Sequence, residues 1–286
     1  MKSHHNGEPV NKDYWTVLPG LIALYAIAIY AFAATIYYSG TSFYLFEQRS
    51  EFVGFQNYLD LILWPRFHNS LFLTGVFCIG AFIQLLMAFA IALFLNLNYK
   101  IMHLLRAIII WPMVIPPVAV GLIWKLLLDP VTGPLTYLVG PFEYFGPNTA
   151  IWSLILIDTW EWAPLYCLII LAALQAIRKE IVEATMVDGL SFWTKLRVVI
   201  IPKVMPIAIL IVILRLIDAI KTFDIVYATT MGGPGNASEV ISVLNYLLVF
   251  RQGFVGRGAA LSMITFIMLW VIGNIFLTIV GKLRRG

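Results

Sequence analysis

Long apolar runs alternate with short polar segments along the whole chain. A run of about 20 apolar residues is long enough for a helix to cross a bilayer, and these runs lack the strict alternation of a transmembrane β-strand. Six such runs cover residues 14–38, 70–96, 104–128, 149–177, 204–229 and 259–281. The pattern predicts an all-α, polytopic membrane protein, in which one six-helix domain over residues 14–281 lies between the tails 1–13 and 282–286.

The basic residues predict which side of the membrane each loop faces. Twelve of the 19 Lys and Arg residues lie in the two tails and in the loops after the second and fourth runs, and four lie in the opposite loops. Loops rich in Lys and Arg stay on the cytoplasmic side. We therefore expect both termini, and the loop at about residues 178–203, to lie in the cytoplasm.

The composition excludes several classes of protein. Hydrophobic residues make up 61% of the chain and charged residues 12%, whereas a soluble domain carries about 25% charged residues. A soluble enzyme and a disordered chain are therefore excluded. The net charge of +4 does not indicate nucleic-acid binding, because the basic residues flank the apolar runs. Cys78 and Cys167 lie inside apolar runs and are predicted to be packing residues, and we expect no cofactor, metal site or catalytic residue in this chain.

Three prolines, Pro112, Pro116 and Pro117, interrupt the third run. Proline lacks a backbone donor and kinks a helix, so carbonyl groups near the kink need other partners. The pattern predicts a kinked third span. It fits a helix that lines a pathway, and it fits a static packing kink as well.

The loop between the fourth and fifth runs is too apolar for a hydrated connector. Glu180 and Glu183 suit the start of a helix, where acidic side chains favour the dipole, and Asp188-Gly189 marks a turn. Ser191 can cap a second short helix, which we expect to end at Pro202. An apolar stripe on the first helix comprises Ile181, Ala184, Val187 and Leu190. Such a helix–turn–helix indicates docking of a soluble partner, and a helix pair at the membrane surface is the alternative.

This loop also carries a recognisable spacing. Glu183-Ala184-Thr185 is followed after three residues by Gly189, and after nine more by Val199-Ile200-Ile201-Pro202. The pattern resembles the signature of the permease subunits of bacterial ABC importers, with modest departures at Thr185, Val199 and Ile201. Residues 52–58, 111–124 and 223–234 resemble the carbohydrate-uptake branch of that family, the maltose and glycerol-phosphate type.

The resemblance implies a coupling helix that docks in a cleft on an ATP-binding subunit and transmits its motion to the spans. Gly189 would permit the tight turn, and Glu183 would be a polar anchor in the cleft. Taken alone, Glu183 also fits a solvated acid at a helix start. The positions that the family uses for coupling correspond here to Glu180, Glu183, Ala184, Asp188, Gly189 and Ser191.

The resemblance further implies a set of partners at the bacterial cytoplasmic (inner) membrane. They are a second homologous permease subunit, two ATP-binding subunits that hold ATP and Mg, and an extracytoplasmic solute-binding protein. The chain would then be a transport subunit that catalyses no reaction itself. It would contact membrane lipid and a sugar or polyol, and no nucleic acid.

Several charged residues lie in or near the spans, and each would cost about 2.5–3.5 kcal/mol if it faced lipid. They must therefore face a partner, a cavity or water. Charges three residues apart on the fifth span can pair with one another. Two interpretations stay open, namely salt bridges that stabilise a broken span and a polar cavity for a ligand. The residues concerned are Lys125, Asp158, Glu161, Arg215, Asp218, Lys221 and Asp224.

The family resemblance implies that the sugar lies against the spans on either side of the coupling loop. Positions of the maltose-type permease are carried over to this chain without gaps, backwards from Glu183 and forwards from Pro202. The matching residues form a candidate substrate site. Carboxylates and a guanidinium hydrogen-bond to hydroxyls, and an indole offers an apolar face to sugar C–H groups. Most of these side chains differ from those of the maltose permease, so the substrate need not be maltose. The site comprises Asp158, Glu161, Trp162, Leu165, Arg215, Asp218, Ala219 and Thr222.

Rival functions use the same residues differently. In an ion-coupled secondary transporter, Asp158, Asp218 and Arg215 would form an ion relay, and the cytoplasmic helix–turn–helix would have no role. A membrane enzyme for lipid-linked sugars would need a charged cluster at one interface, whereas several charges here lie mid-span. An ABC permease for a non-sugar solute shares the loop signature and is the nearest rival.

Overall fold

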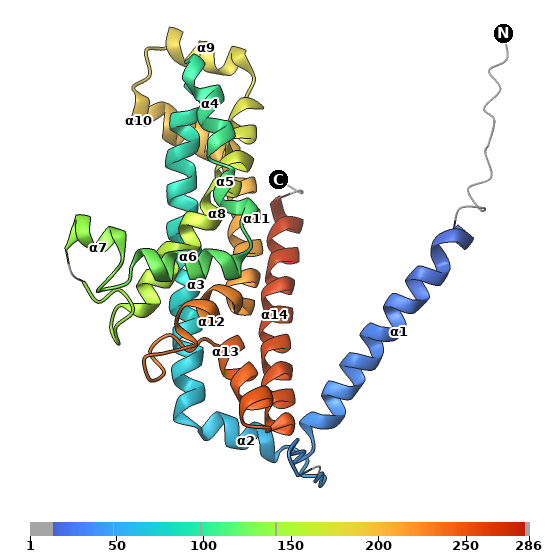
Figure 1. Cartoon of the computed structure of the whole chain (residues 1–286). Helices are drawn as coiled ribbons and strands as arrows, with labels where there is room; N and C mark the ends of the chain where they lie inside the picture. Colours follow the sequence, from blue (N-terminus) through green and yellow to red (C-terminus); the bar gives the residue numbers. More distant parts are fainter. Residues whose placement is uncertain (1–13, 48, 98, 141, 284–286) are drawn as a thin grey trace, which may run out of the picture.

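The computed structural model describes residues 14–283 apart from residues 48, 98 and 141 (Figure 1). Expectations for the tail 1–13 and for residues 284–286 lie outside these residues. The described chain is built from helices, with short loops and a few isolated β-bridges between them. In chain order the helices are α1 (Tyr14–Ser39), α2 (Gln56–Leu63), α3 (Pro65–Leu95), α4 (Lys100–Ile108), α5 (Trp111–Val114), α6 (Pro117–Leu127), α7 (Pro134–Val139), α8 (Ala150–Gln175), α9 (Lys179–Val187), α10 (Phe192–Lys195), η1 (Leu196–Ile200), α11 (Ile201–Lys221), α12 (Asp224–Thr230), α13 (Ile241–Tyr246), η2 (Leu247–Arg251) and α14 (Val255–Leu283).

Five helices in the described chain are long and apolar enough to cross a membrane. The pair Lys100–Val114 and Pro117–Leu127 passes the same test together, so up to six spans result when this bent pair counts as one. The five straight candidates are Val17–Ser39, Pro65–Leu95, Ala150–Gln175, Phe192–Lys221 and Val255–Thr278.

The bundle has two distinct ends (Figure 1). Helices α9 and α10 lie at one end, which we call the α9 end. Helix α2 and the connection from α1 to α2 lie at the other, which we call the α2 end. Helix α1 begins on the side of the α9 end and α14 finishes on that side, so the two outermost spans run in opposite directions.

Close packing of α3 against α8 forms the centre of the bundle. A Cβ atom on Gly80 would lie 2.8 Å from Ile155 Cγ2, so the glycine allows the two backbones to approach. Nearer the α9 end, Ala88, Ala92 and Cys167 are fully buried in one apolar cluster. Cys78 borders a second cluster, and both cysteines are free thiols, so the prediction that they are packing residues is confirmed.

The third span bends at its prolines, as predicted, and the bend is sharp enough to divide it into separate helices. The axes of the two halves differ by 97° at a break after Val114. Ile115 and Pro116 have extended ψ values of 130° and 138°, because a residue that precedes proline avoids the helical region. Pro117 then starts α6, which runs across the bundle and packs against α12 (Figure 1).

Two predicted boundaries around the fifth span were wrong. Pro202 does not end a helix. It occupies the first turn of α11, where a missing N–H costs no hydrogen bond, and the helical run continues from Phe192 to Lys221. The span also stops before residue 229, because Thr222 is extended with ψ 124° and α12 begins separately at Asp224.

Helix α1 leans away from the other spans (Figure 1). None of its most apolar 18-residue window is buried by the rest of the chain. It packs against α14, where the rings of Phe32 and Phe266 lie 5.2 Å apart. Its apolar surface is therefore left to lipid or to another subunit.

Candidate functional site

A buried ion pair joins α8 to α11. Arg215 and Asp158 form a salt bridge, and each residue is 3% exposed. Gln84 of α3 binds both: its amide nitrogen donates to Asp158 Oδ2 at 2.5 Å, and its amide oxygen accepts from Arg215 Nε at 2.7 Å. Buried charges are tolerated when they are paired and hydrogen-bonded. The three side chains therefore link three spans through one polar cluster.

Trp160 and Trp162 on α8 contact different neighbours. The Arg215 guanidinium carbon lies 5.9 Å from the centroid of the Trp162 ring, within the range of a cation–π contact. Trp160 instead meets Trp124 of α6 edge to face, with centroids 5.4 Å apart. Trp162 therefore borders the polar cluster, and Trp160 packs toward the broken span.

Three more of the eight candidate substrate residues lie on α8 and α11. Glu161 is 2% exposed, and its Oε2 atom has no hydrogen-bond partner among the described residues. Ala219 is 1% exposed in an apolar cluster, and Leu165 packs partly buried against another. Glu161 is thus the buried polar group of this site with unmet hydrogen-bonding capacity.

The remaining candidates lie at the open end of α11. Asp218 and Lys221 form an ion pair of 3.4 Å, and their side chains are 49% and 54% exposed. They lie about one and two turns beyond Arg215 on the same helix. Thr222 follows them, partly exposed, at the end of α11.

The candidate substrate residues therefore divide into two groups. Asp158, Arg215, Glu161 and Ala219 are buried within the chain. Trp162, Leu165, Asp218 and Thr222 are partly or fully open on its surface. A half-exposed charge on a membrane span is unfavourable against lipid, so the open surface around Asp218 is expected to face water or another protein.

Sequence reasoning missed Gln84. Its run from 70 to 96 carries no charge, so nothing there indicated a partner for the charges on the other spans. One signal was present, because a glutamine amide deep within a long apolar run needs polar partners as much as a charge does.

The turn after α9 forms as the sequence predicts. Gly189 has φ +64°, a left-handed conformation that glycine adopts without steric cost. The Gly189 N–H donates to the Met186 carbonyl at 3.1 Å, and the Leu190 N–H donates to the Thr185 carbonyl at 3.1 Å. This pair of hydrogen bonds is the Schellman motif. It fixes the direction in which the chain leaves Asp188, the C-cap residue of α9.

Ser191 caps the next helix. Its hydroxyl oxygen accepts from the Thr194 backbone N–H at 3.3 Å, as predicted for an N-cap. Helix α10 then continues without interruption through the π-helical segment η1 into α11. The turn at Gly189 is therefore connected by one helical run to the polar cluster at Arg215.

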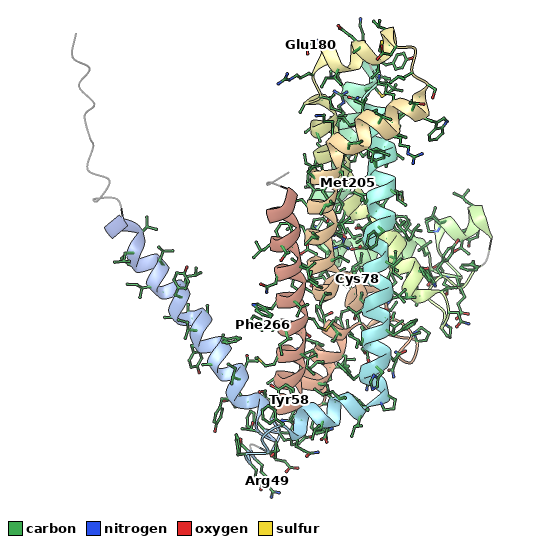
Figure 2. All side chains as sticks on the ribbon, turned by 180° about the vertical axis from the view of Figure 1, so that it is seen from behind. Arg49, Tyr58, Cys78, Glu180, Met205 and Phe266 are labelled. Atoms are coloured by element: carbon green, nitrogen blue, oxygen red, sulfur yellow. The ribbon has the colours of Figure 1, made fainter. Side chains whose placement is uncertain are left out.

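The α9 end presents an apolar surface to solvent. Glu180 and Glu183 are exposed near the start of α9, and Figure 2 shows Glu180 at the extreme of the molecule. Ala184 is exposed as well. Large apolar side chains surround them, with Met186, Val187, Phe192 and Trp193 being 59% to 87% exposed. An exposed apolar patch of this kind is typical of a contact with another protein or with the membrane surface.

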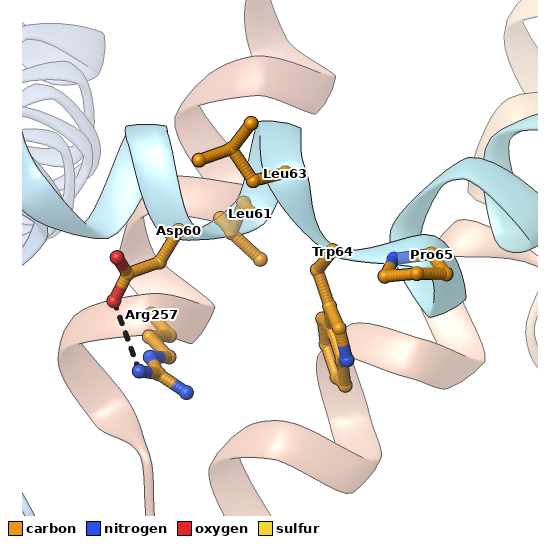
Figure 3. A pocket seen from close by; sticks show the side chains of 6 residues that line it. All are labelled: Asp60, Leu61, Leu63, Trp64, Pro65 and Arg257. Carbon is orange, nitrogen blue, oxygen red and sulfur yellow. Dashed lines mark hydrogen bonds and ion pairs between the residues drawn. The ribbon is translucent and has the colours of Figure 1, made fainter.

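The α2 end carries its own ion pairs. Arg66 of α3 donates two hydrogen bonds to Glu239, at 2.7 and 2.6 Å, and so ties down the loop between α12 and α13. Arg257 donates to Asp60 at 2.9 Å beside a cavity of about 360 Å³ under Trp64 (Figure 3). These contacts hold the loops of the α2 end in place.

No cluster of three or more His, Cys, Asp or Glu side chains suited to a metal ion occurs in the described part of the chain. What the geometry offers is a bundle of spans with a buried polar cluster, an open charged face and an exposed helix–turn–helix at one end. These features define a polytopic helical membrane protein with polar groups inside its bundle.

Comparison with known proteins agrees with this class. The chain belongs to the family of binding-protein-dependent transport system inner membrane components, whose pattern matches residues 62–285. It is 32% identical over 281 residues to the trehalose/maltose transport system permease protein MalF of Thermococcus litoralis, covering 95% of this chain and 94% of that protein. It is 29% identical over 269 residues to the trehalose transport system permease protein SugA of Mycobacterium tuberculosis, covering 89% and 86%.

A solved structure shares the fold. The crystal structure of a bacterial ABC transporter involved in the import of the acidic polysaccharide alginate contains a chain that matches with a TM-score of 0.75 at 20% identity. The match covers 95% of this chain and 96% of that one.

Proposed function

We propose that this chain is a transmembrane subunit of an ATP-driven ABC importer that moves a sugar, polyol or related polyhydroxylated solute into the cell. The observation that carries the proposal is the exposed helix–turn–helix at the α9 end, within a chain of the binding-protein-dependent transport family. The sugar class is supported by relatives named for trehalose and maltose transport.

Helix α9 is the coupling helix of this proposal. Its exposed residues from Glu180 to Ser191 dock on an ATP-binding subunit, where Glu183 is a polar anchor and the apolar neighbours fill the contact. The continuous helical run from Phe192 to Lys221 then carries the motion of the turn to Arg215 and Asp218. Rigid helices transmit such a displacement without needing flexible linkers.

The partners follow from the same proposal. A second permease subunit covers the open face with Asp218 and completes the pathway, two ATP-binding subunits hold ATP and Mg, and an extracytoplasmic binding protein delivers the solute at the α2 end. The α9 end and both termini are cytoplasmic, and the assembly lies in the bacterial inner membrane. The chain itself catalyses no reaction and holds no cofactor.

The test is purification of the tagged chain from its native membrane with its partners, followed by vanadate-sensitive ATP hydrolysis and uptake of a panel of sugars. Gly189→Pro combined with Glu183→Ala should abolish bound ATPase activity, because proline cannot adopt φ +64°. Gly189→Asn is the matched control and should keep most activity, since asparagine tolerates this conformation. A wild-type chain that purifies intact and alone, and takes up solute under an ion gradient, would refute the proposal in favour of a secondary transporter.

A further inference from the structure

A groove of about 430 Å³ lies between α13, η2 and α14 and reaches the end of α11. Small-molecule sites have volumes of about 300–1,000 Å³, mostly apolar walls and a few polar groups. This groove has that character, and it lies apart from the candidate residues on α8. Its lining includes Lys221, Phe223, Ser242, Tyr246, Ser262 and Thr265.

The groove adjoins the candidate substrate site at Thr222. Lys221 and Phe223 line the groove and flank Thr222 in the chain. The Ser242 hydroxyl, also in the lining, donates a hydrogen bond to the Thr222 carbonyl. Because Lys221 pairs with the half-exposed Asp218, this rim of the groove is unsuited to lipid and faces water or protein.

An aromatic wall leads along one side of the groove. Tyr246 lies 5.1 Å from Phe223 and 5.2 Å from the 66% exposed Phe250, measured between ring centroids. Tyr227 stacks on Phe223 at 5.0 Å and holds the Arg251 guanidinium through its hydroxyl at 3.1 Å. Aromatic faces of this kind suit the C–H surfaces of a sugar ring.

The hydroxyl groups of the lining are arranged as acceptors. Thr265 donates its own proton to the Leu261 carbonyl at 2.9 Å, and Ser262 donates to the Gly258 carbonyl at 3.0 Å. Ser242 likewise donates to a carbonyl. Ser262 also accepts from the Asn245 amide at 2.8 Å, which uses one of its two lone pairs. The lone pairs that remain on the three oxygens can accept from a ligand rich in O–H donors, and an acyl chain offers them no donor.

We propose that this groove is a second binding site for the transported sugar or polyol, through which the solute reaches the residues around Thr222. The site rests on the proposed function, and it names positions on α13 and α14 that the family resemblance did not supply. It lies toward the α2 end, where α14 begins, so the solute occupies it before the residues on α8 (Figure 1).

Thiol labelling of the whole transporter in proteoliposomes tests the proposal. Thr265→Cys is introduced after Cys78 and Cys167 are replaced by alanine, and a water-soluble methanethiosulfonate reagent is applied with and without trehalose, maltose or mannitol. Thr278→Cys on the same helix is the matched control, since both threonines are bonded to a carbonyl four residues earlier. We expect at least one of these solutes to slow labelling at residue 265 about threefold or more, and none to affect residue 278.

Two outcomes overturn the inference. A thiol at residue 265 that the reagent cannot reach means that lipid or protein fills the groove. A thiol that reacts at the same rate with and without all three solutes means that the groove is hydrated and binds none of them. Uptake measured in the same proteoliposomes separates either result from a failure of the proposed function, because uptake would then continue.

A transport measurement gives an independent readout. Phe250→Ala removes the outer ring of the aromatic wall, and we expect it to lower the sugar moved per ATP hydrolysed about three- to tenfold, the size of one aromatic contact. Phe72→Ala is the control, because Phe72 is 67% exposed on α3, outside the groove, and Phe250 is 66% exposed. Equal effects of the two substitutions would contradict a ligand contact at Phe250.

Discussion

At the scale of single residues, the decisive feature is how the chain compensates charges inside an apolar bundle. Arg215 and Asp158 neutralise one another, and Gln84 donates a hydrogen bond to Asp158 and accepts one from Arg215. Burying such a pair costs desolvation free energy. Removing one partner costs far more, because the other charge is then left buried and unpaired. The cluster therefore makes α3, α8 and α11 a single unit.

Breaking this cluster on one side should be strongly destabilising. Arg215→Met leaves Asp158 buried without its cation, and we expect a loss of about 3–5 kcal/mol of stability. Replacing all three groups together, with Arg215→Met, Asp158→Leu and Gln84→Leu, should recover most of the loss, because no unpaired polar group stays behind. Thermal unfolding of the detergent-solubilised complex measures both variants.

The exposed pair supplies the control for this measurement. Asp218→Asn removes a half-exposed partner of Lys221, and its effect on stability should stay within about 1 kcal/mol. If Asp218→Asn destabilised the complex as much as Arg215→Met, burial would not be the source of the effect.

The charged residues within the spans are evident from the sequence. Of their two ion pairs, the sequence predicts one and not the other. Asp218 and Lys221 pair at i,i+3 as helix geometry predicts. Arg215 instead pairs with Asp158, 57 positions earlier, and no local rule connects two residues on different spans. Whether the eight candidate residues contact a solute stays a prediction.

At the scale of elements, breaks in the helices decide where polar groups lie. The break of the third span was predictable, because proline acts locally on the residue before it. The end of α11 at Lys221 was not, because residues 223–229 are apolar enough to extend the run. That end depends on tertiary contacts: Ser242 bonds the Thr222 carbonyl, and α12 packs on α6.

The contact between α6 and α12 depends on a glycine. A Cβ atom on Gly121 would lie 2.9 Å from Thr229 Oγ1 and 3.1 Å from the Ile225 carbonyl oxygen. Gly121→Ala should therefore push α12 away and cost about 1–3 kcal/mol, as overpacking does. Thermal unfolding and the uptake rate of the reconstituted transporter measure the change.

Gly75→Ala on α3 is the control for Gly121→Ala. A Cβ atom on Gly75 of α3 would meet no atom within 4 Å, so Gly75→Ala should be neutral or stabilise by up to about 1 kcal/mol through helix propensity. Similar losses for both alanines would rule out close packing of α12 as the cause.

At the scale of the whole molecule, each end of the bundle has its own surface. The α9 end exposes apolar side chains around a fixed turn. The α2 end also exposes large apolar side chains, with Phe52, Phe55 and Leu63 being 79% to 83% exposed, and the ion pairs Arg66–Glu239 and Arg257–Asp60 hold its loops. The two ends lie at opposite extremes of the bundle, which is the arrangement that the proposed subunit needs for a partner on each side of a membrane.

The orientation of these ends in the membrane is the last prediction. The excess of Lys and Arg predicts that the turn after α9 lies in the cytoplasm and the loop after α6 outside. In a chain without Cys78 and Cys167, expressed without the ATP-binding subunit so that the α9 end is uncovered, a membrane-impermeant maleimide should therefore modify Thr132→Cys in intact spheroplasts, and Asp188→Cys after lysis alone. Both positions are exposed, so burial does not separate them. Modification of Asp188→Cys in intact spheroplasts would show that the topology is the reverse of the predicted one. The α9 end would then be out of reach of a cytoplasmic ATP-binding subunit.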